Sequence, residues 1–427
     1  MSGPKELREP FALENPLAHS DIEHFSRIRR RWRLFFDKRY QALRSAIDSL
    51  THGLEYGSSA EKEADGPGQQ DDKGFLRVVS WNIERGKHLD GIRSYLQDNE
   101  LLKSADVVIL NEVDKGMARS GNRNVAAELA DALGFEYVFG NHYLCLDFGD
   151  PRDGVHKDPN AVGLHGNAIL SRFPITRAEV FSLTISKDKF GSSEKRFGHK
   201  KSLWAEIDSP LGLIPVFAVH LDPYASPSQR GAQLQDVLEV VAREGFSKAL
   251  MGGDFNTTTN NLRALPTTVW TVLHKAVLGV KYSLHHAMHP FERYERRILG
   301  LLQKQGFDMS AYNDMEAPTS RYEIGSFESE SKLGEHMPEA AARALMRFCR
   351  RKLEPWNGEA NFKLDWFAGR GLRGLRAGEI TDDEGRASVD PQVFHKPEWE
   401  GQRLSDHDPI LVDIVGEESP SSIHGSK

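Results

Sequence analysis

The segment Ala249-Leu250-Met251-Gly252-Gly253-Asp254-Phe255-Asn256 places a short apolar run directly before a cluster of polar side chains. Its first three residues have the composition of a buried strand, and its two glycines permit unusual backbone angles and close approach of other groups. The same order recurs, because apolar runs at 77–79, 106–110 and 214–219 each lead to an Asn, Glu or His. We therefore expect strands whose polar ends meet at one rim of a sheet.

Helical segments separate these strands. They span Leu89 to Lys103, Asn122 to Leu133 and Pro227 to Glu244. Alternation of short apolar strands with helices predicts an α/β fold, and the sequence contains no internal repeat.

The predicted rim is rich in oxygen donors, because it collects the amide of Asn82 and the carboxylates of Glu112, Asp254 and Asp406. Mg²⁺ prefers such ligands and keeps several waters, whereas zinc is less expected because no cysteine pair is available to hold it. Each residue alone has a plainer explanation. A single Asp at a strand end is usually a turn or cap residue, and a lone His220 is more often a core histidine.

Six short motifs in one order resemble the endonuclease/exonuclease/phosphatase superfamily of metal-dependent phosphoesterases over about residues 75 to 415. They are Ser80–Glu84, Asn111–Asp114, Gly166–Ala168, His220–Asp222, Gly252–Asn256 and Ser405–Asp408. Any one motif alone is a weak signal. The resemblance implies two packed, mostly antiparallel or mixed β-sheets flanked by helices, that is, a four-layer sandwich.

The resemblance also implies a role for each matching residue. Asn82 and Glu112 bind the metal, with Asp406 as a further carboxylate there. Asp254 activates or orients the attacking water, and Asn256 holds that water or the phosphate. His407 faces the scissile phosphate and is oriented by Asp365. His220 is a further catalytic residue, at a position that carries His in many members and another residue in some others, and Asn167 matches a polar residue that often lies near the phosphate. The implied cofactor is Mg²⁺, with Mn²⁺ as a substitute.

These residue types suit hydrolysis by water, because a metal, an amide and imidazoles stabilise charge on phosphate oxygens. No covalent nucleophile is evident, since Cys145 and Cys349 lie outside every motif. Arg370 and Arg373 follow the Asp365 segment and are expected to reach the substrate's phosphate, although a basic run is usually a solvated face.

Two further clusters have alternative explanations. Asp114 and Arg119 form a solvated loop pair or face the substrate, and the sequence favours neither. The cluster His285-His286-Met288-His289 lacks the spacing of a coherent ligand set, so a helix surface is the preferred interpretation.

Composition is typical of a globular intracellular enzyme, with 427 residues, 39% hydrophobic and 27% charged. No apolar run has the length of a membrane span, and residues 1–6 lack the apolar stretch of a secretory signal. Two cysteines fit a reducing compartment, so a cytoplasmic location is expected. The net charge of −7 disfavours non-specific binding of nucleic acid.

Four regions are expected along the chain. Residues 1–55 form an N-terminal helical extension, in which 20–54 are one long amphipathic helix opened by a Ser20-x-x-Glu23 capping box. Residues 56–74 are a flexible linker, and 75–415 are the catalytic domain with an insertion around 258–360. Within the insertion, Val269 to Leu278, Glu292 to Gln305 and Glu339 to Leu353 are expected to be helical. Residues 416–427 are a disordered tail.

The amphipathic stripe of the extension is expected to dock on its own domain. A partner helix or an anionic membrane is less favoured, although the arginines between 27 and 33 keep the membrane open. The expected function is hydrolysis of a phosphodiester in nucleic acid, nucleotide or phospholipid. The alternatives are a phosphomonoesterase acting on a phosphorylated inositol or lipid headgroup, and an inactive phosphate-binding scaffold.

Overall fold

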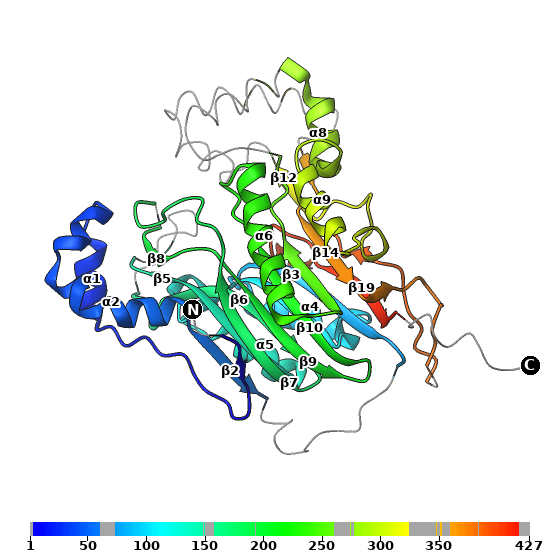
Figure 1. Cartoon of the computed structure of the whole chain (residues 1–427), viewed down its shortest axis with the longest axis horizontal. Coiled ribbons are helices and arrows are strands. Elements are labelled where there is room, and N and C mark those ends of the chain that lie inside the picture. The colour runs from blue at the N-terminus through cyan, green and yellow to red at the C-terminus, as the bar shows by residue number, and fades with distance from the viewer. Residues whose placement is uncertain are drawn as a thin grey trace, which may run out of the picture.

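The computed structural model describes residues 3–59, 73–147, 149, 158–192, 194–259, 274, 277–323, 347, 351, 359–382 and 384–417. Strands of two β-sheets cross the middle of the molecule (Figure 1), with α1 and α2 at one end and α8 projecting from the opposite side. Helices cover the outer faces of the sheets, so the predicted four-layer α/β sandwich is confirmed.

The first sheet has the strand order β1-β7-β9-β10-β11-β14 and the second has the order β15-β19-β3-β4-β6-β5-β2. The first is built from β1 (Lys5–Glu6), β7 (Ile175–Ser182), β9 (Lys201–Ser209), β10 (Gly212–His220), β11 (Ala249–Asp254) and β14 (Asp365–Arg370). The second is built from β15 (Leu372–Gly374), β19 (Ile410–Gly416), β3 (Leu76–Arg85), β4 (Val107–Lys115), β6 (Leu164–Ser171), β5 (Glu136–Cys145) and β2 (Leu54–Ser58), with β8 (Arg196–Gly198) beside β5 and β16 (Gln392–Val393) beside β19.

Strand β4 shows why both faces of a central strand are apolar. Val107 and Ile109 face the layer between the two sheets, whereas Val108 and Leu110 pack under the helices of the outer face. Successive side chains of a strand point to opposite faces, so a continuous apolar run suits a strand that is covered on both sides.

Helices α4 (Leu89–Asp98) and α5 (Val125–Leu133) cover the second sheet, and α6 (Pro227–Glu244) and α9 (Arg296–Lys304) cover the first. Ser226 and Gln229 cap the start of α6 in a capping box, and α6 has the predicted bounds. Helix α4 is shorter than predicted because the chain turns to extended backbone at Asn99, before the short helix η2 (Leu102–Ser104).

The prediction of one long helix over 20–54 is wrong. The chain forms α1 (His19–Ser26), the 3-10 helix η1 (Arg31–Phe36) and α2 (Lys38–Thr51). Extended backbone at Arg30 and Asp37 interrupts the helical path, and the Asp37 side chain caps α2 by accepting from the Tyr40 amide at 2.8 Å. The predicted Ser20 cap is also wrong, because α1 begins after Ala18.

The extension packs on the domain through a few residues. The buried ring of Phe25 meets the ring of Phe197 edge-on at 5.4 Å, and Leu34, Ile47 and Leu50 join the same core cluster. Residues 56–58, expected in a linker, instead belong to β2, which pairs antiparallel with β5. Ser59 and Lys73 of that predicted linker are buried, and residues 60–72 lie outside the described residues.

The insertion contains α8 (Val280–Met288), the short helices η5 (Pro290–Glu292) and η6 (Ser310–Tyr312), and the small sheet of β12 (Ser320–Glu323) with β13 (Glu359–Phe362). The helix predicted over 292–305 is present as α9. The predicted helices over 269–278 and 339–353 fall almost wholly outside the described residues, as does the tail beyond 417. A two-stranded sheet of β17 (Glu398–Trp399) and β18 (Gln402–Arg403) precedes β19.

Candidate active site

Two parallel strand pairs bring the predicted polar residues to one rim. Strand β3 runs parallel to β4 and aligns Asn82 with Asn111, while β10 runs parallel to β11 and aligns His220 with Asp254. Asp365 lies opposite Asp254 at the first residue of β14. Parallel strands end at the same edge, which is why residues far apart in sequence converge there.

Irregular backbone shapes this rim. The register of β3 and β4 shifts just after Asn82 and Leu110, and Glu112 and Asn256 adopt positive φ angles of 54° and 48°. Such bulges and left-handed residues re-aim side chains and are concentrated at functional sites. At Gly253 the φ of 139° and a Cβ position only 2.0 Å from the Val219 oxygen exclude any other residue.

Asp254 is buried and almost fully hydrogen-bonded. Its carboxylate accepts from the Asn256 amide at 2.8 Å, from Asn256 Nδ2 at 2.9 Å and from Asn82 Nδ2 at 3.2 Å. Its backbone N–H donates to Asn111 Oδ1 at 2.8 Å. Burial raises the pKa of the Asp254 carboxyl to about 7, so this carboxylate holds a proton far more readily than a surface aspartate.

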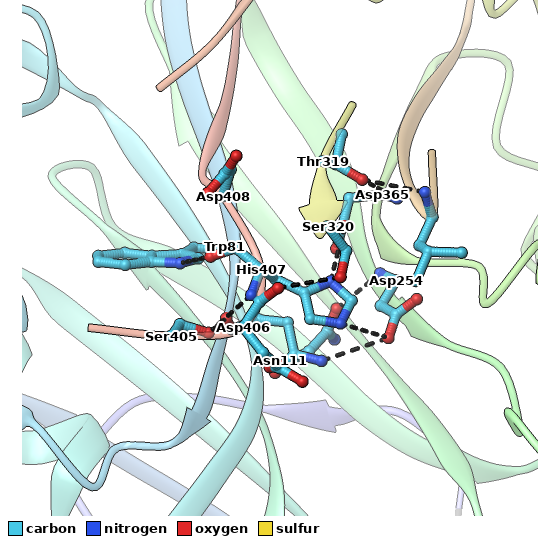
Figure 2. Close-up of polar contacts among 12 residues, drawn as sticks. Trp81, Asn111, Asp254, Thr319, Ser320, Asp365, Ser405, Asp406, His407 and Asp408 are labelled. Carbon is cyan, nitrogen blue, oxygen red and sulfur yellow. Dashed lines mark hydrogen bonds and ion pairs between the residues drawn. The ribbon is translucent and has the colours of Figure 1, made fainter. Parts of the chain in front are cut away.

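His407 faces Asp254 and is held from behind by Asp365 (Figure 2). Its Nδ1 lies 2.8 Å from Asp365 Oδ2, and its Nε2 lies 3.9 Å from Asp254 Oδ2. Burial opposes the charged imidazolium, but the carboxylates of Asp365, Asp254 and Asp406 outweigh it and hold the pKa of His407 well above its usual value. His407 is therefore a cation in the site.

The loop that carries His407 is fixed by hydrogen bonds to both sheets. Trp81 Nε1 donates to the His407 carbonyl at 2.9 Å, and the Ser405 hydroxyl donates to the Asn82 carbonyl at 2.6 Å. The Asp365 amide donates to the Thr319 hydroxyl at 3.0 Å. The first two bonds join β3 to the loop that carries His407 (Figure 2).

A second group of carboxylates lies on the β3 and β4 side. Burial raises the pKa of Glu84, and the charge of Asp406 raises it further, while the Asp406 amide donates to Glu84 Oε2 at 3.2 Å. Burial also opposes ionisation of Glu112, but Arg85 and the other nearby positive groups hold its pKa well below its usual value. Together with the Asn82 amide, these groups form an oxygen-rich set that suits a hard cation.

Asp254, Asp365 and His407 have donor atoms that all lie within 4.8 Å of one another. The His407 Nδ1 already pairs with Asp365, which makes this group a hydrogen-bonded acid and base rather than a ligand cage. The donor chemistry for Mg²⁺ is better on the Glu112 side.

His220 and Asn167 are buried beside this group. His220 Nε2 lies 3.6 Å from Asp254 Oδ2 and 3.9 Å from Glu112 Oε1. Burial, aided by the Lys200 ammonium, holds the pKa of His220 well below its usual value, so its imidazole is neutral. Asn167 Nδ2 makes a long 3.5 Å contact to the Ala218 carbonyl, and its Oδ1 has no hydrogen-bond partner within the described residues.

The expectation that Arg370 and Arg373 reach the substrate is wrong. Strand β14 starts at the site with Asp365 and runs away from it, so Arg370 lies opposite Ala249 at the far end of β11. Five residues of strand span about 17 Å. Arg373 is exposed and pairs with Glu379. The sequence order is right, but the strand direction takes both residues to the opposite edge.

Asp114 and Arg119 are neither a solvated pair nor part of the substrate-facing rim. Arg119 is fully buried and forms two hydrogen bonds with Asp114 at 2.6 and 2.9 Å and one with Glu194 at 2.9 Å. His165 Nδ1 lies 2.7 Å from Asp114. The buried Cys145 thiol contacts Glu194 at 3.4 Å, and burial raises its pKa well above the usual value, so it is not a nucleophile.

The histidine cluster lies at the end of α8, where His285 is exposed and His286 largely buried. His285 Nε2 pairs with Glu292 Oε2 at 2.8 Å, and His286 Nδ1 lies 3.7 Å from the same oxygen. These three residues are the second group in the described part of the chain whose donor atoms lie within 4.8 Å. The sequence did not indicate it because Glu292 comes from η5.

Two charged groups near the site were not among the predicted site residues. Lys200 precedes β9, and its ammonium is attracted by Glu112, Asp222 and Asp254, although burial lowers its pKa to about 8. Glu84 belongs to the Ser80–Glu84 motif, but only the fold brings it next to Asp406. Lys200 stands in the run His199-Lys200-Lys201, which belongs to none of the six motifs.

Comparison with known proteins gives a family for nearly half of the chain. Residues 79–278 match the family described as Endonuclease/Exonuclease/phosphatase family. No curated protein matches the chain. None of the helices in the described ranges is long and apolar enough to cross a bilayer.

Solved structures similar to the chain share 14% sequence identity with it. An endonuclease/exonuclease/phosphatase family protein from Leptotrichia buccalis has a TM-score of 0.41 over 79% of this chain and 98% of its own. The human Nocturnin catalytic domain has a TM-score of 0.43 over 85% and 98%. A 3'-5' exonuclease from Neisseria meningitidis has a TM-score of 0.41 over 79% and 98%.

Proposed function

We propose that this chain, whose residues 79–278 belong to the endonuclease/exonuclease/phosphatase family, hydrolyses a phosphodiester with a divalent metal ion and water. The observation that carries the proposal is the pairing of a cationic His407, backed by Asp365, with the buried carboxylate of Asp254. A base and a fixed cation on either side of a phosphate are what in-line attack by water needs.

Each residue then has a task. Asp254 accepts the proton of the attacking water, and Asn256 and Asn82 hold the carboxylate in place. The His407 imidazolium stabilises negative charge that builds on the phosphate oxygens, while neutral His220 donates or accepts a hydrogen bond there. Asp365 fixes the tautomer and orientation of His407.

A Mg²⁺ ion would fit beside Glu112, with Asn82 and Asp406 as further oxygen donors, and Mn²⁺ is the natural substitute. Its chemistry would be to neutralise charge on the phosphate. Burial raises the pKa of Glu84, and the charge of Asp406 raises it further although Lys87 pairs with Glu84, so the close approach of these two carboxylates supports a cation at this side.

Hydrolysis of a phosphomonoester is the second candidate. Lys200 and Arg85, both close enough to Glu112 to interact with its charge, would help to bind a doubly charged phosphate. An inactive phosphate-binding scaffold is the third, although the acid and base groups are all in place. We also propose a reducing compartment for the chain, since Cys145 is a buried free thiol.

The test compares bis(p-nitrophenyl) phosphate with p-nitrophenyl phosphate, with Mg²⁺, with Mn²⁺ and with chelator. We expect turnover of the diester that chelation removes and that Asp254→Asn lowers by at least about a hundredfold. Faster turnover of the monoester would favour the second candidate. Binding of inorganic phosphate without turnover of either ester would favour the scaffold.

A further inference from the structure

The 3-10 helix η1 exposes three aromatic side chains. Leu34 points into the core, whereas Trp32, Phe35 and Phe36 are 55%, 66% and 81% exposed. A 3-10 helix repeats every three residues, so Trp32 and Phe35 share one side, and the Trp32 and Phe36 rings meet at 6.4 Å. We call these three residues the aromatic patch. Large exposed apolar patches mark interaction surfaces.

Arginines surround the aromatic patch, although the whole chain is acidic. Arg29, Arg30, Arg31 and Arg33 are all exposed. Of these four arginines, only Arg31 forms an ion pair with another described residue, namely Asp188 at 2.6 Å. The acidic groups nearby are already engaged, because Asp37 contacts His24 at 2.7 Å and Glu23 pairs with Arg27. The surface is therefore both apolar and positively charged.

The Arg31–Asp188 ion pair joins this surface to the loop that precedes β8. The loop adds Ile185, which is 61% exposed, and Lys187. Between the loop and α2 lies a cavity of about 380 Å³ whose walls include Arg31, Tyr40, Ile185, Lys187 and His199. The next residue after His199 is Lys200, whose ammonium interacts with Glu112 and Asp254. The cavity wall is therefore one residue along the chain from a group at the active-site rim, and the wall itself carries the basic Arg31 and Lys187 together with the acidic Asp48 and Asp188.

We propose that the aromatic patch and its arginines bind the anionic surface of a phospholipid membrane, and that the phosphoester cleaved at the rim belongs to a lipid headgroup. The proposal rests on the function proposed above. Aromatic rings insert at the boundary between headgroups and acyl chains, while arginines bind lipid phosphates. The cavity then receives a headgroup beside Arg31 and Lys187.

Charge and shape favour a membrane over other occupants. In a symmetric dimer the same patch meets its own copy, so the four arginines would face four others at close range. A single-stranded nucleic acid stacks its bases on aromatic rings, but the aliphatic Ile185 offers no stacking face. An anionic bilayer accommodates both the arginines and the apolar side chains.

The test is sedimentation of the full-length protein with vesicles of phosphatidylcholine, with and without phosphatidylserine. One variant combines Trp32→Ser with Phe36→Ser, and another combines Arg29→Gln, Arg30→Gln and Arg33→Gln. Leu213→Ser is the matched control, because Leu213 is 53% exposed near the end of β10 that is remote from His220. All of these side chains are exposed, so melting temperatures should not change.

We expect wild type and Leu213→Ser to bind the vesicles that contain phosphatidylserine and to be released by salt. Each arginine replaced should weaken binding about fivefold, which corresponds to about 1 kcal/mol per charge at an anionic surface. The aromatic variant should lose most binding to both kinds of vesicle. Equal binding by wild type and both patch variants would overturn the proposal.

Two parallel measurements separate the other occupants. Sedimentation velocity measures self-association. If the wild-type protein self-associates but does not bind vesicles, and only the patch variants lose self-association, the surface binds a second copy. Binding of a labelled oligonucleotide that depends on the same residues, again without vesicle binding, would assign it to nucleic acid. Both results overturn the membrane proposal.

Turnover distinguishes failure of this proposal from failure of the proposed function. The patch variants should hydrolyse a soluble diester at the wild-type rate but lose at least tenfold on phospholipid in vesicles. If the wild-type protein binds vesicles but cleaves no ester, the proposed membrane surface is retained and the proposal that a lipid headgroup is the substrate is overturned. If the wild-type protein hydrolyses the soluble diester but does not bind vesicles, only the proposed membrane surface is overturned.

Discussion

At the residue scale, two neighbouring groups have pKa values raised for different reasons. Burial raises the pKa of Asp254 because a carboxylate is less stable away from water. Three carboxylates raise the pKa of His407 because each stabilises the imidazolium. The pair therefore holds a proton acceptor and a fixed positive charge 3.9 Å apart.

His407→Ala should lower kcat by about two orders of magnitude or more, because it removes the charge that stabilises the phosphate. Asp365→Asn should act through the same imidazole, so the double variant should lose little more than His407→Ala alone. Steady-state kinetics of the two single variants and the double variant measure this. Additive losses would show that Asp365 has a separate role.

The rate should depend on pH through Asp254. Only the ionised carboxylate accepts a proton, so kcat/KM should rise as pH rises toward about 7, the pKa of the buried group, and then level off. A bound cation lowers this midpoint, because it favours the carboxylate. Profiles recorded with Mg²⁺ and Mn²⁺ give the midpoint, and a rate that falls through this range would exclude Asp254 as the base.

Residue chemistry at the site was largely predictable. Asn82, Glu112 and Asp254 each follow an apolar run, and parallel strand ends meet at one edge. His407 precedes the apolar strand β19 and was placed by its motif. Arg370 was misplaced because sequence spacing does not give the direction in which a strand leaves the site.

At the element scale, the N-terminal extension depends on a few deeply buried residues. Phe25→Ala should lower the free energy of unfolding by about 3 to 5 kcal/mol, because it empties the contact with Phe197. Phe36→Ala, on the exposed side of η1, should change it by less than about 0.5 kcal/mol. Denaturant melts of both variants test this. Equal, small effects would show that the extension does not stabilise the domain.

A second prediction concerns the end of β11. Gly253→Ala should destabilise the fold and lower activity, because the new methyl group would lie 2.0 Å from the Val219 oxygen. Gly134→Ala is the control, since Gly134 also has a positive φ, of 69°, but no atom within 4 Å of its Cβ position. It should cost only about 1 kcal/mol. Melting temperatures of the two variants compare steric overlap with backbone strain alone.

The helices and strands were predicted with uneven success for physical reasons. Helix α6 carries its own boundary signals in Ser226, Gln229 and Gly245. The stripe over 20–54 has a helical period, but that period continues through the extended residues Arg30 and Asp37, where capping and packing break the helix. Periodicity reports which face is apolar and not where hydrogen bonds stop.

At the scale of the whole molecule, buried lysines should make stability depend on pH. Burial lowers the pKa of Lys201 to about 7, from 10.5 in an exposed chain. Between these values the unfolded chain binds a proton that the folded chain does not, so the free energy of unfolding should rise as pH increases from about 7. Lys201→Met should remove this part of the slope. An unchanged slope, from urea melts across this range, would show that Lys201 is not buried.

The four-layer arrangement followed from the motif set, whereas its accessory parts did not. Residues 54–55 of β2 were assigned to the helical extension, and residues 56–58 to a linker because 56–74 are rich in Gly, Gln and acidic residues without periodicity, yet the strand pairs with β5 at the sheet edge. The aromatic patch was included in an apolar stripe, and only the fold shows which of its side chains remain exposed.

The position of β19 has a consequence for synthesis of the chain. This strand, near the C-terminal end of the described residues, pairs with β3 and so completes a sheet begun more than 300 residues earlier. Until that segment has left the ribosome, β3 is paired with β4 on one side only and His407 is absent. Pairing at such sequence separation is slow, so the site forms only after this strand has emerged, and nascent chains need protection at the open edge of β3.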